Sequence, residues 1–247
     1  MGRPTTRSRP EGLIMTEVLF VVTGADHWTL ADGTQHPTGF WAEELIEPYR
    51  VFTDAGFHLT FATPGGRSPV VDEASLAPDA AGGEDRSDEL RRTLTELRPV
   101  LDSPAVLEDV RAEDYDLVFV PGGHGPMEDL AVSEPFGRLL AEFMAAGKLV
   151  SVVCHAPAAL LPARGADGGW LFDGYRMTGF TNEEETQAGL AEKAPWLLED
   201  RLRESGARFD AGPAWESHVV VDRSLYTGQN PASSRAVAER VVEATKS

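Results

Sequence analysis

The sequence predicts an α/β domain built on a parallel β-sheet, and three observations carry this prediction. A strand, a helix and a second strand follow one another between residues 17 and 62, which is the order of a right-handed βαβ unit. Two further apolar runs, residues 116–120 and 149–153, have the composition of buried parallel strands. An amphipathic stretch over residues 134–147 separates these runs and predicts a connecting helix.

The first βαβ unit follows from local patterns. Residues 17–23 form an apolar run that predicts the first strand. We expect Thr38 to cap a helix over residues 39–55, in which Pro48 should produce a kink. Alternating apolar and polar residues over 57–62 predict the second strand.

Residues 63–99 interrupt the α/β pattern. This stretch is polar and rich in glycine, proline, aspartate and alanine, so we interpret it as an insertion with one helix near residues 87–96. A short helical piece over residues 106–110 should follow. We expect one domain over residues 16–247, preceded by a disordered leader over residues 1–15, and Met15 is an alternative natural start.

The last third of the chain continues the alternation of strands and helices. The elements expected there are a turn-rich stretch over 165–174, a strand over 175–180, a helix capped by Thr181 or Asn182, an amphipathic helix over 195–205, edge strands over 207–210 and 217–221, a strand from residue 225, and a final helix over 235–245.

Composition limits the classes of function. The formal net charge is −18 and no dense stripe of Lys and Arg is present, so nucleic acid is not an expected partner. No apolar run approaches the roughly 20 residues that span a bilayer, and the N-terminus does not resemble a secretory signal. One cysteine excludes an internal disulfide and is compatible with a reducing compartment. We therefore expect a cytoplasmic protein with no nucleic-acid or membrane partner. The acidity itself does not identify a substrate, and a small-molecule substrate is expected only from the candidate site described below.

Two histidines, His27 and His36, lie in a polar stretch over residues 25–37. Two histidines in one loop can be metal ligands, but solvated loop residues are the more frequent case. The chain also lacks the glycine spacing of a dinucleotide fingerprint and the lysine of a P-loop. We expect neither a metal nor a cofactor.

Cys154 is the main candidate for chemistry. The strand over residues 149–153 breaks at Cys154 and His155, and small apolar residues with Pro157 in the first turn then predict a helix. A sharp turn from strand to helix places its residue beside free helix N–H groups, which would lower the pKa of a thiol. A buried structural cysteine is the alternative, but the turn and the adjacent histidine favour a nucleophile.

A glycine-rich loop follows the buried strand that ends at residue 120. Residues 121–127 contain three glycines, which allow the backbone to point N–H groups at an anion or a developing oxyanion. The loop alone is weak evidence and could be a plain turn. Combined with Cys154 on the next strand, it favours an oxyanion hole.

Three consecutive glutamates, Glu183, Glu184 and Glu185, begin the helix after residue 181. Acidic residues suit the first turn of a helix because they face its positive dipole end, and this reason alone explains them. Alternatively, one carboxylate pairs with His155 and orients its ring. The spacing does not choose among the three.

Four motifs in order carry a resemblance to a known family: residues 121–125, 152–157, 178–185 and 227–233. They resemble the ThiJ/PfpI superfamily, which has the class I glutamine amidotransferase-like fold, and are most similar to its branch of heat-shock chaperones and glutathione-independent glyoxalases. The likeness extends over nearly the whole chain from residue 17. It implies a flavodoxin-like three-layer sandwich with a mostly parallel central sheet, a cysteine nucleophile elbow and a homodimer.

The resemblance also implies roles for individual side chains. Cys154 is the implied nucleophile, with His155 directly after it and Glu185 as the acid that pairs with the histidine. Glu44, rather than Glu43, is the glutamate of the first helix that contacts the sulfur.

The remaining implied site residues belong to the backbone and to the glycine-rich loop. The N–H groups of Gly123 and His155 would form the oxyanion hole. His124, the residue after Gly123, would bind the substrate. Two residues depart from the family pattern: Ala156 replaces the usual glycine, and Asn182 replaces a common aspartate.

The resemblance implies an enzyme that acts on small reactive dicarbonyls and converts methylglyoxal to lactate without glutathione. An amidase, a peptidase or a deglycase would use the same cysteine, histidine and glutamate, and a chaperone or oxidative sensor would need no turnover. The late histidine–glutamate pair of true amidotransferases has no counterpart in residues 206–247, so the amidotransferase-like label describes the fold.

Overall fold

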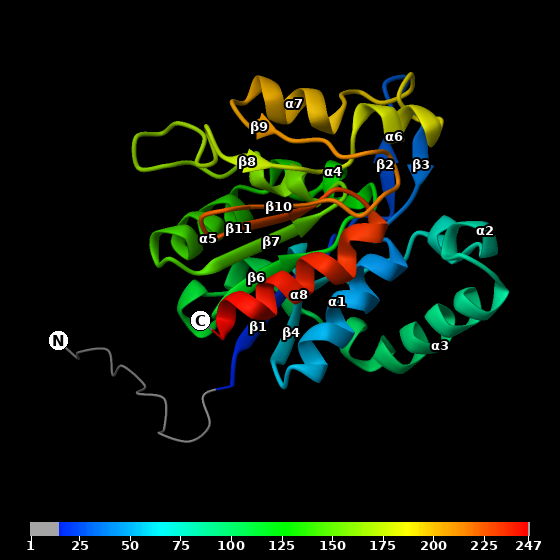
Figure 1. Cartoon of the computed structure of the whole chain (residues 1–247), viewed down its shortest axis with the longest axis horizontal. Helices are drawn as coiled ribbons and strands as arrows, with labels where there is room; N and C mark the ends of the chain where they lie inside the picture. The colour runs from blue at the N-terminus through cyan, green and yellow to red at the C-terminus, as the bar shows by residue number, and fades with distance from the viewer. Residues whose placement is uncertain (1–14, 247) are drawn as a thin grey trace.

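A seven-stranded β-sheet with strand order β10-β11-β7-β6-β1-β4-β5 forms the centre of the computed structural model, which describes residues 15–246 (Figure 1). Its strands are β1 (Glu17–Val21), β4 (His58–Thr63), β5 (Ala105–Val106), β6 (Leu117–Val120), β7 (Leu149–Val153), β10 (Val219–Asp222) and β11 (Leu225–Gly228). Neighbouring strands are parallel except β10 and β11, which are antiparallel. The predicted mostly parallel sheet is therefore confirmed.

The middle of the sheet is apolar on both faces. β1 lies between β4 and β6, and its Phe20 stands opposite Phe61 on one side and Phe119 on the other. The ring of Phe20 lies 5.2 Å from that of Phe61 and 5.0 Å from that of Phe119, centroid to centroid. Because helices cover both faces, the central strands are continuous hydrophobic runs, as the sequence pattern predicted.

Helices complete the outer two layers. They are α1 (Ala42–Asp54), α2 (Pro78–Ala81), α3 (Glu84–Leu101), α4 (Gly125–Glu128), α5 (Glu134–Ala145), α6 (Asn182–Gln187), α7 (Leu198–Glu204) and α8 (Ser234–Thr245). α1 packs against α8 in front of the sheet in Figure 1, and α5 packs against β7. The chain moves from β1 through α1 to β4, and in the opposite direction from β6 through α5 to β7, so right-handed crossovers place α1 and α5 on opposite faces. The three-layer sandwich is confirmed.

The first helix begins later than predicted, and Thr38 does not cap it. α1 starts at Ala42, and the Thr38 hydroxyl instead donates to Asp72 Oδ2 at 2.7 Å. The preceding residues form an extended bridge, in which Phe40 N–H donates to Val70 O at 2.9 Å. A Cβ at Gly39 would lie 1.9 Å from the same carbonyl oxygen, so glycine is required where these two backbones meet.

The inserted segment contains more helix than the sequence predicted. α3 runs from Glu84 to Leu101 instead of residues 87–96 and is preceded by the short α2. α3 packs along α1 and buries Leu90 and Leu97.

A buried carboxylate joins three helices on this side of the sheet. Glu47 of α1 forms ion pairs with Arg50, with Arg86 of α3, and with Arg235 of α8, whose Nε lies 2.9 Å from Glu47 Oε2. Because the carboxylate is largely buried and its partners come from different helices, the cluster fixes α3 and α8 relative to α1.

Two predictions of secondary structure were wrong. The polar stretch expected to be a loop over 25–37 holds a hairpin of β2 (His27–Thr29) and β3 (Gln35–Pro37). The strand expected over 175–180 is reduced to β8 (Arg176–Met177), which pairs with β9 (Arg208–Phe209) outside the central sheet. The backbone beyond β8 is held by other groups instead, because Thr178 N–H donates to Thr227 Oγ1 at 2.9 Å.

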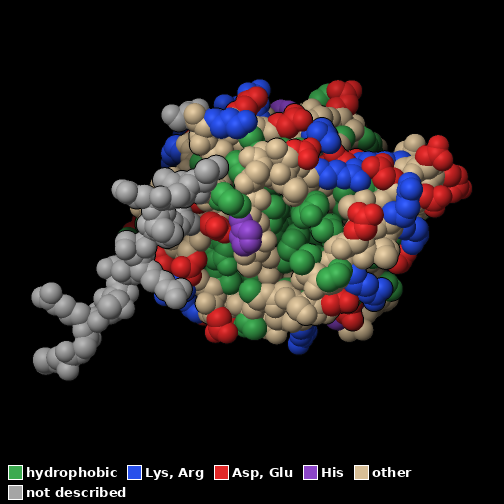
Figure 2. Space-filling model, turned by 90° about the horizontal axis from the view of Figure 1, so that it is seen from below, with side chains coloured by type: hydrophobic (Ala, Val, Ile, Leu, Met, Phe, Trp, Pro, Cys, Tyr) green, Lys and Arg blue, Asp and Glu red, His purple; other side chains and the backbone are tan. Residues whose placement is uncertain are grey.

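The surface agrees with the mixed charge of the sequence. On the face drawn in Figure 2, Lys and Arg side chains are interspersed with Asp and Glu rather than gathered in a stripe. Within residues 15–246, no helix combines the length and the apolar character that crossing a membrane requires. The expected leader, apart from Met15, lies outside the described residues.

We predict that α3 belongs to the cooperative folding unit. Leu90→Ala should lower the free energy of unfolding by about 2–5 kcal/mol, because it leaves a cavity in the core beneath α3. Val100→Ala on the exposed side of the same helix is the control and should change stability by no more than about 0.5 kcal/mol. Urea denaturation measures both, and equal effects would contradict the prediction.

Candidate active site

Cys154 lies at a strained turn directly after β7. Its φ is +60°, in the left-handed region that non-glycine residues rarely occupy. Backbone hydrogen bonds hold this conformation from both sides: Cys154 N–H donates to Gly228 O at 2.9 Å, and Cys154 O accepts from Phe180 N–H at 2.8 Å. The predicted elbow is thus present, followed by a five-residue 3₁₀ turn, η6 (Ala156–Leu160), in place of an α-helix.

His155 contacts the sulfur and a carboxylate with its two ring nitrogens. Its Nδ1 lies 3.3 Å from Cys154 Sγ, and its Nε2 lies 2.7 Å from Glu185 Oε2. An ionised carboxylate only accepts hydrogen bonds, so Nε2 carries the hydrogen and the lone pair of Nδ1 faces the thiol. The three side chains therefore lie in the order that a nucleophile, a base and an orienting acid would require.

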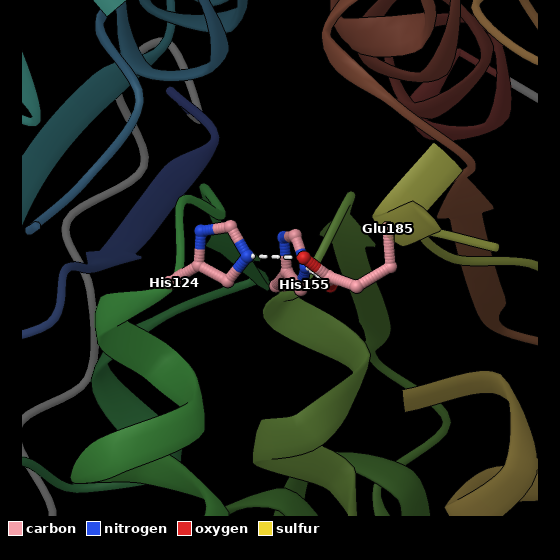
Figure 3. A group of neighbouring side chains, drawn as sticks. All are labelled: His124, His155 and Glu185. Carbon is pink, nitrogen blue, oxygen red and sulfur yellow. Dashed lines mark hydrogen bonds and ion pairs between the residues drawn. The ribbon is translucent and has the colours of Figure 1, made fainter. Parts of the chain in front are cut away.

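A second imidazole binds the other oxygen of the same carboxylate. His124 Nε2 lies 2.8 Å from Glu185 Oε1, and the rings of His124 and His155 lie 4.0 Å apart (Figure 3). Buried Trp28 of the β2–β3 hairpin stacks on His124 at 4.9 Å. The sequence placed His124 in the substrate-binding loop but did not predict this pair. The available signal was its position after β6, the strand beside β7.

The charges of this cluster follow from its burial and its pairing. Burial, with a contribution from His124, lowers the pKa of His155 to about 4, so its ring is neutral near neutral pH. Burial opposes the charge of Glu185, but its two histidine partners hold its pKa below the usual value for a glutamate. The pair at rest is therefore a neutral imidazole and a carboxylate.

Glu44 approaches the sulfur from the first turn of α1. It is completely buried, its Oε2 accepts the N–H of Gly122 at 2.7 Å, and its carboxyl lies beside the Cys154 thiol. Its Oε1 has no hydrogen-bond partner among the described residues. Burial raises the pKa of Glu44 to about 8, so this carboxyl keeps its proton near neutral pH. The structure thus brings Glu44 to the sulfur, and Glu43 lies instead toward Arg86, 3.7 Å away.

The predicted lowering of the thiol pKa was wrong. Burial raises the pKa of Cys154 well above its usual value, and Glu44 raises it further, while the Gly123 N–H acts in the opposite direction. Five residues of 3₁₀ helix supply little dipole, and the thiol is only 3 % exposed, so desolvation dominates. The sulfur therefore holds its proton at rest, and the Nδ1 lone pair of His155 lies 3.3 Å from it.

The glycine-rich loop is tightly enclosed between α1 and the elbow. A Cβ at Gly122 would lie 2.6 Å from Glu44 Oε2 and 2.7 Å from Val153 O. Gly123 has a φ of +89°, and its N–H is directed at the Cys154 thiol. No larger residue fits at these positions, and the loop presents one backbone N–H, that of Gly123, at the sulfur.

The three consecutive glutamates have different surroundings. Glu183 is exposed, and Glu185 holds the two histidines. Glu184 is buried and forms a capping box with Thr181, so Thr181 rather than Asn182 is the N-cap. Glu184 Oε1 also accepts hydrogen bonds from Gln229 and Asn230, which ties α6 to the end of β11.

One group in the described part of the chain has ligand atoms placed for a metal ion: His124, His155 and Glu185, with those atoms within 4.8 Å of one another. Both Nε2 atoms already donate to the carboxylate, so a cation would have to displace both hydrogens. His27 and His36, the two histidines considered as metal ligands from the sequence, have different partners. His27 pairs with Asp26, and the ring of His36 contacts the ring of His124.

Comparison with known proteins identifies the family. The model of the DJ-1/PfpI family matches residues 37–244. The chain therefore belongs to the DJ-1/PfpI family, as the four sequence motifs predicted.

Individual relatives cover nearly the whole chain. It is 31% identical to the glutathione-independent glyoxalase HSP31 of Saccharomyces cerevisiae, over 93% of this chain and 98% of the relative. It is also 31% identical to the protein/nucleic acid deglycase HchA of Pseudomonas aeruginosa, over 88% of this chain and 77% of that protein. The crystal structure of glyoxalase III from Candida albicans has a TM-score of 0.81 and 26% identity, over 93% of this chain and 97% of that one.

We predict that Glu44→Gln makes Cys154 more acidic. The thiol titrates above the pKa of Glu44, so the carboxylate is charged when the sulfur ionises and repels the thiolate. Removing that charge should move the midpoint of iodoacetamide labelling about one pH unit or more toward lower pH. Glu43→Gln, on the neighbouring position of α1, is the control and should leave the midpoint in place. An unchanged midpoint in Glu44→Gln would contradict the coupling.

Proposed function

We propose that this protein is a cysteine-dependent glyoxalase that converts methylglyoxal to lactate without glutathione. The observation that carries the proposal is the chain of contacts from Cys154 Sγ through His155 to Glu185, at 3.3 Å and 2.7 Å. Two relatives named as glyoxalases, one of them 31% identical over most of the chain, support the same activity.

The first step is addition of the thiol to the aldehyde. His155 Nδ1 takes the thiol proton as Sγ attacks the aldehyde carbon. The proton then passes from Nδ1 to the former aldehyde oxygen, which gives a hemithioacetal and returns His155 to its neutral form. The N–H groups of Gly123 and His155 stabilise the negative charge on the former aldehyde oxygen. Glu44, protonated near neutral pH, lies beside the sulfur without adding negative charge there.

The second step moves a hydrogen between the two carbons. Neutral His155 removes the proton from the carbon bound to sulfur, and the electron pair gives an enediolate with its charge on the ketone oxygen. His155 returns this proton to the ketone carbon, while the hemithioacetal hydroxyl gives its proton to the ketone oxygen, so that the thioester of a 2-hydroxy acid forms. Glu185 stabilises the imidazolium formed in between. His124 donates its Nε2 hydrogen to Glu185 and so holds that carboxylate in place. Water then hydrolyses the thioester to release lactate and the free thiol.

A deglycase is the second candidate. The same triad attacks the product of a dicarbonyl and an amine, and the relative HchA is named as a protein/nucleic acid deglycase. A chaperone role, a homodimer and a cytoplasmic location stay predictions from the family resemblance.

The decisive assay uses purified full-length protein and methylglyoxal in a buffer without any thiol. Lactate should form, and Cys154→Ala should abolish its formation because no other cysteine is present. Equal turnover by the wild type and the variant would end the proposal. Parallel assays on glycated amino acids, peptides and simple amides separate the deglycase and the hydrolases, and protection of a client from aggregation by Cys154→Ala would favour the chaperone.

We predict unequal effects of two neighbouring glutamates on the reaction. Glu185→Gln should lower kcat by about 10²–10⁴-fold, because the ring of His155 loses the carboxylate that fixes its tautomer and stabilises its charge. Glu183→Gln, on the exposed side of the same helix turn, should have wild-type kcat. Steady-state kinetics measure both, and similar kcat values for the two variants would contradict the role of Glu185.

A further inference from the structure

Trp215 is a strained and exposed residue whose position is closely fixed. Its φ is +64°, which is a genuine outlier for a bulky side chain, and it is 46 % exposed. Its backbone N–H donates to Glu184 Oε1 at 2.9 Å, and its indole N–H donates to Gln187 Oε1 at 2.5 Å. Strained backbone persists where surrounding contacts over-determine it, and such positions cluster at functional sites.

The hydrogen bond to Glu184 connects this strain to the candidate site. Glu184 is completely buried and also binds Gln229 and Asn230, so it is a fixed acceptor rather than a mobile surface group. The next residue along α6, Glu185, accepts hydrogen bonds from the imidazoles of His124 and His155. The backbone of Trp215 is therefore anchored to the same helix turn that orients His155.

The ring of Trp215 ends a series of aromatic contacts that leads from the surface to the imidazole of His155. Its edge meets Phe180 at 5.5 Å and 73°, and Phe180 lies over His155 at 4.3 Å and 33°. Exposure falls along the series from 46 % for Trp215 to 5 % for Phe180 and 1 % for His155. Phe180 also donates its N–H to the carbonyl of Cys154, so the series is attached to the elbow.

Phe180 and Trp215 together form an aromatic wall, and its chemistry suits an uncharged apolar group. Both side chains offer ring surfaces. The buried carboxylate of Glu184 binds the Trp215 N–H and that of Glu185 binds His155, so both disfavour an anion here. Resting on the proposed function, we propose that Trp215 is a specificity-determining residue, which with Phe180 contacts the substituent on the ketone carbon of a 2-oxoaldehyde bound at Cys154. Aromatic substituents, as in phenylglyoxal, are the class that this wall favours.

The test compares phenylglyoxal with methylglyoxal. Trp215→Gly removes the ring and suits the positive φ, so it separates loss of the ring from backbone strain. The ratio of kcat/KM for phenylglyoxal to that for methylglyoxal should fall about 3- to 10-fold, the scale of one aromatic contact. Trp215→Phe should restore most of the ratio. Trp196→Ala removes a tryptophan whose ring contacts Arg201 and not Phe180, and it should leave the ratio unchanged.

A second measurement does not depend on turnover. Alkylation rates of Cys154 by 2-bromoacetophenone and by bromoacetone give the same phenyl-to-methyl comparison. A fall in this ratio in Trp215→Gly supports the assignment of Trp215 even if the wild-type protein converts neither dicarbonyl. The absence of turnover would refute only the proposed function. Unchanged ratios in both assays, or an equal fall in Trp196→Ala, would overturn the assignment of Trp215.

Discussion

The site depends on one carboxylate that accepts a hydrogen bond from each of two imidazoles. Glu185 holds His155 through one oxygen and His124 through the other, and these histidines follow adjacent strands of the sheet. A buried charge is stable only where its partners meet it with good geometry, and removal of one partner from such a pair costs about 3–5 kcal/mol. The arrangement therefore requires that β6, β7 and α6 have fixed positions relative to one another.

The residue before Glu185 supplies much of that fixation. Glu184 closes the capping box with Thr181 and accepts hydrogen bonds from the segment after β11, the strand that also receives the N–H of Cys154. Adjacent residues at the start of a helix point in different directions, so one glutamate anchors the helix while the next reaches the histidines. This division of roles explains why a short helix of six residues, α6, can carry a buried acid.

Much of the fold could be predicted from the sequence, because its central strands are buried on both faces and have clear apolar runs. Thr38 could not be placed correctly, since its partner Asp72 is far away in the sequence and competes with the helix cap. The choice among three glutamates depended on the start of α6 and on the position of that helix next to His155. The spacing of residues in the sequence shows neither the start nor the position of the helix. Glu185 was identified instead from the resemblance to a family.

The pKa of the thiol is the clearest case in which a local pattern predicts the wrong direction. The pattern around Cys154 indicates free N–H groups, and one does reach the sulfur from Gly123. The burial of the site and the approach of Glu44 are tertiary effects, and for the thiol they outweigh that single donor. A protonated cysteine beside a neutral His155 resists ionisation until a substrate takes the developing charge. The same enclosure that raises the pKa of Cys154 thus restricts its reactivity to molecules small enough to reach the sulfur and electrophilic enough to accept its electrons as the proton moves to Nδ1.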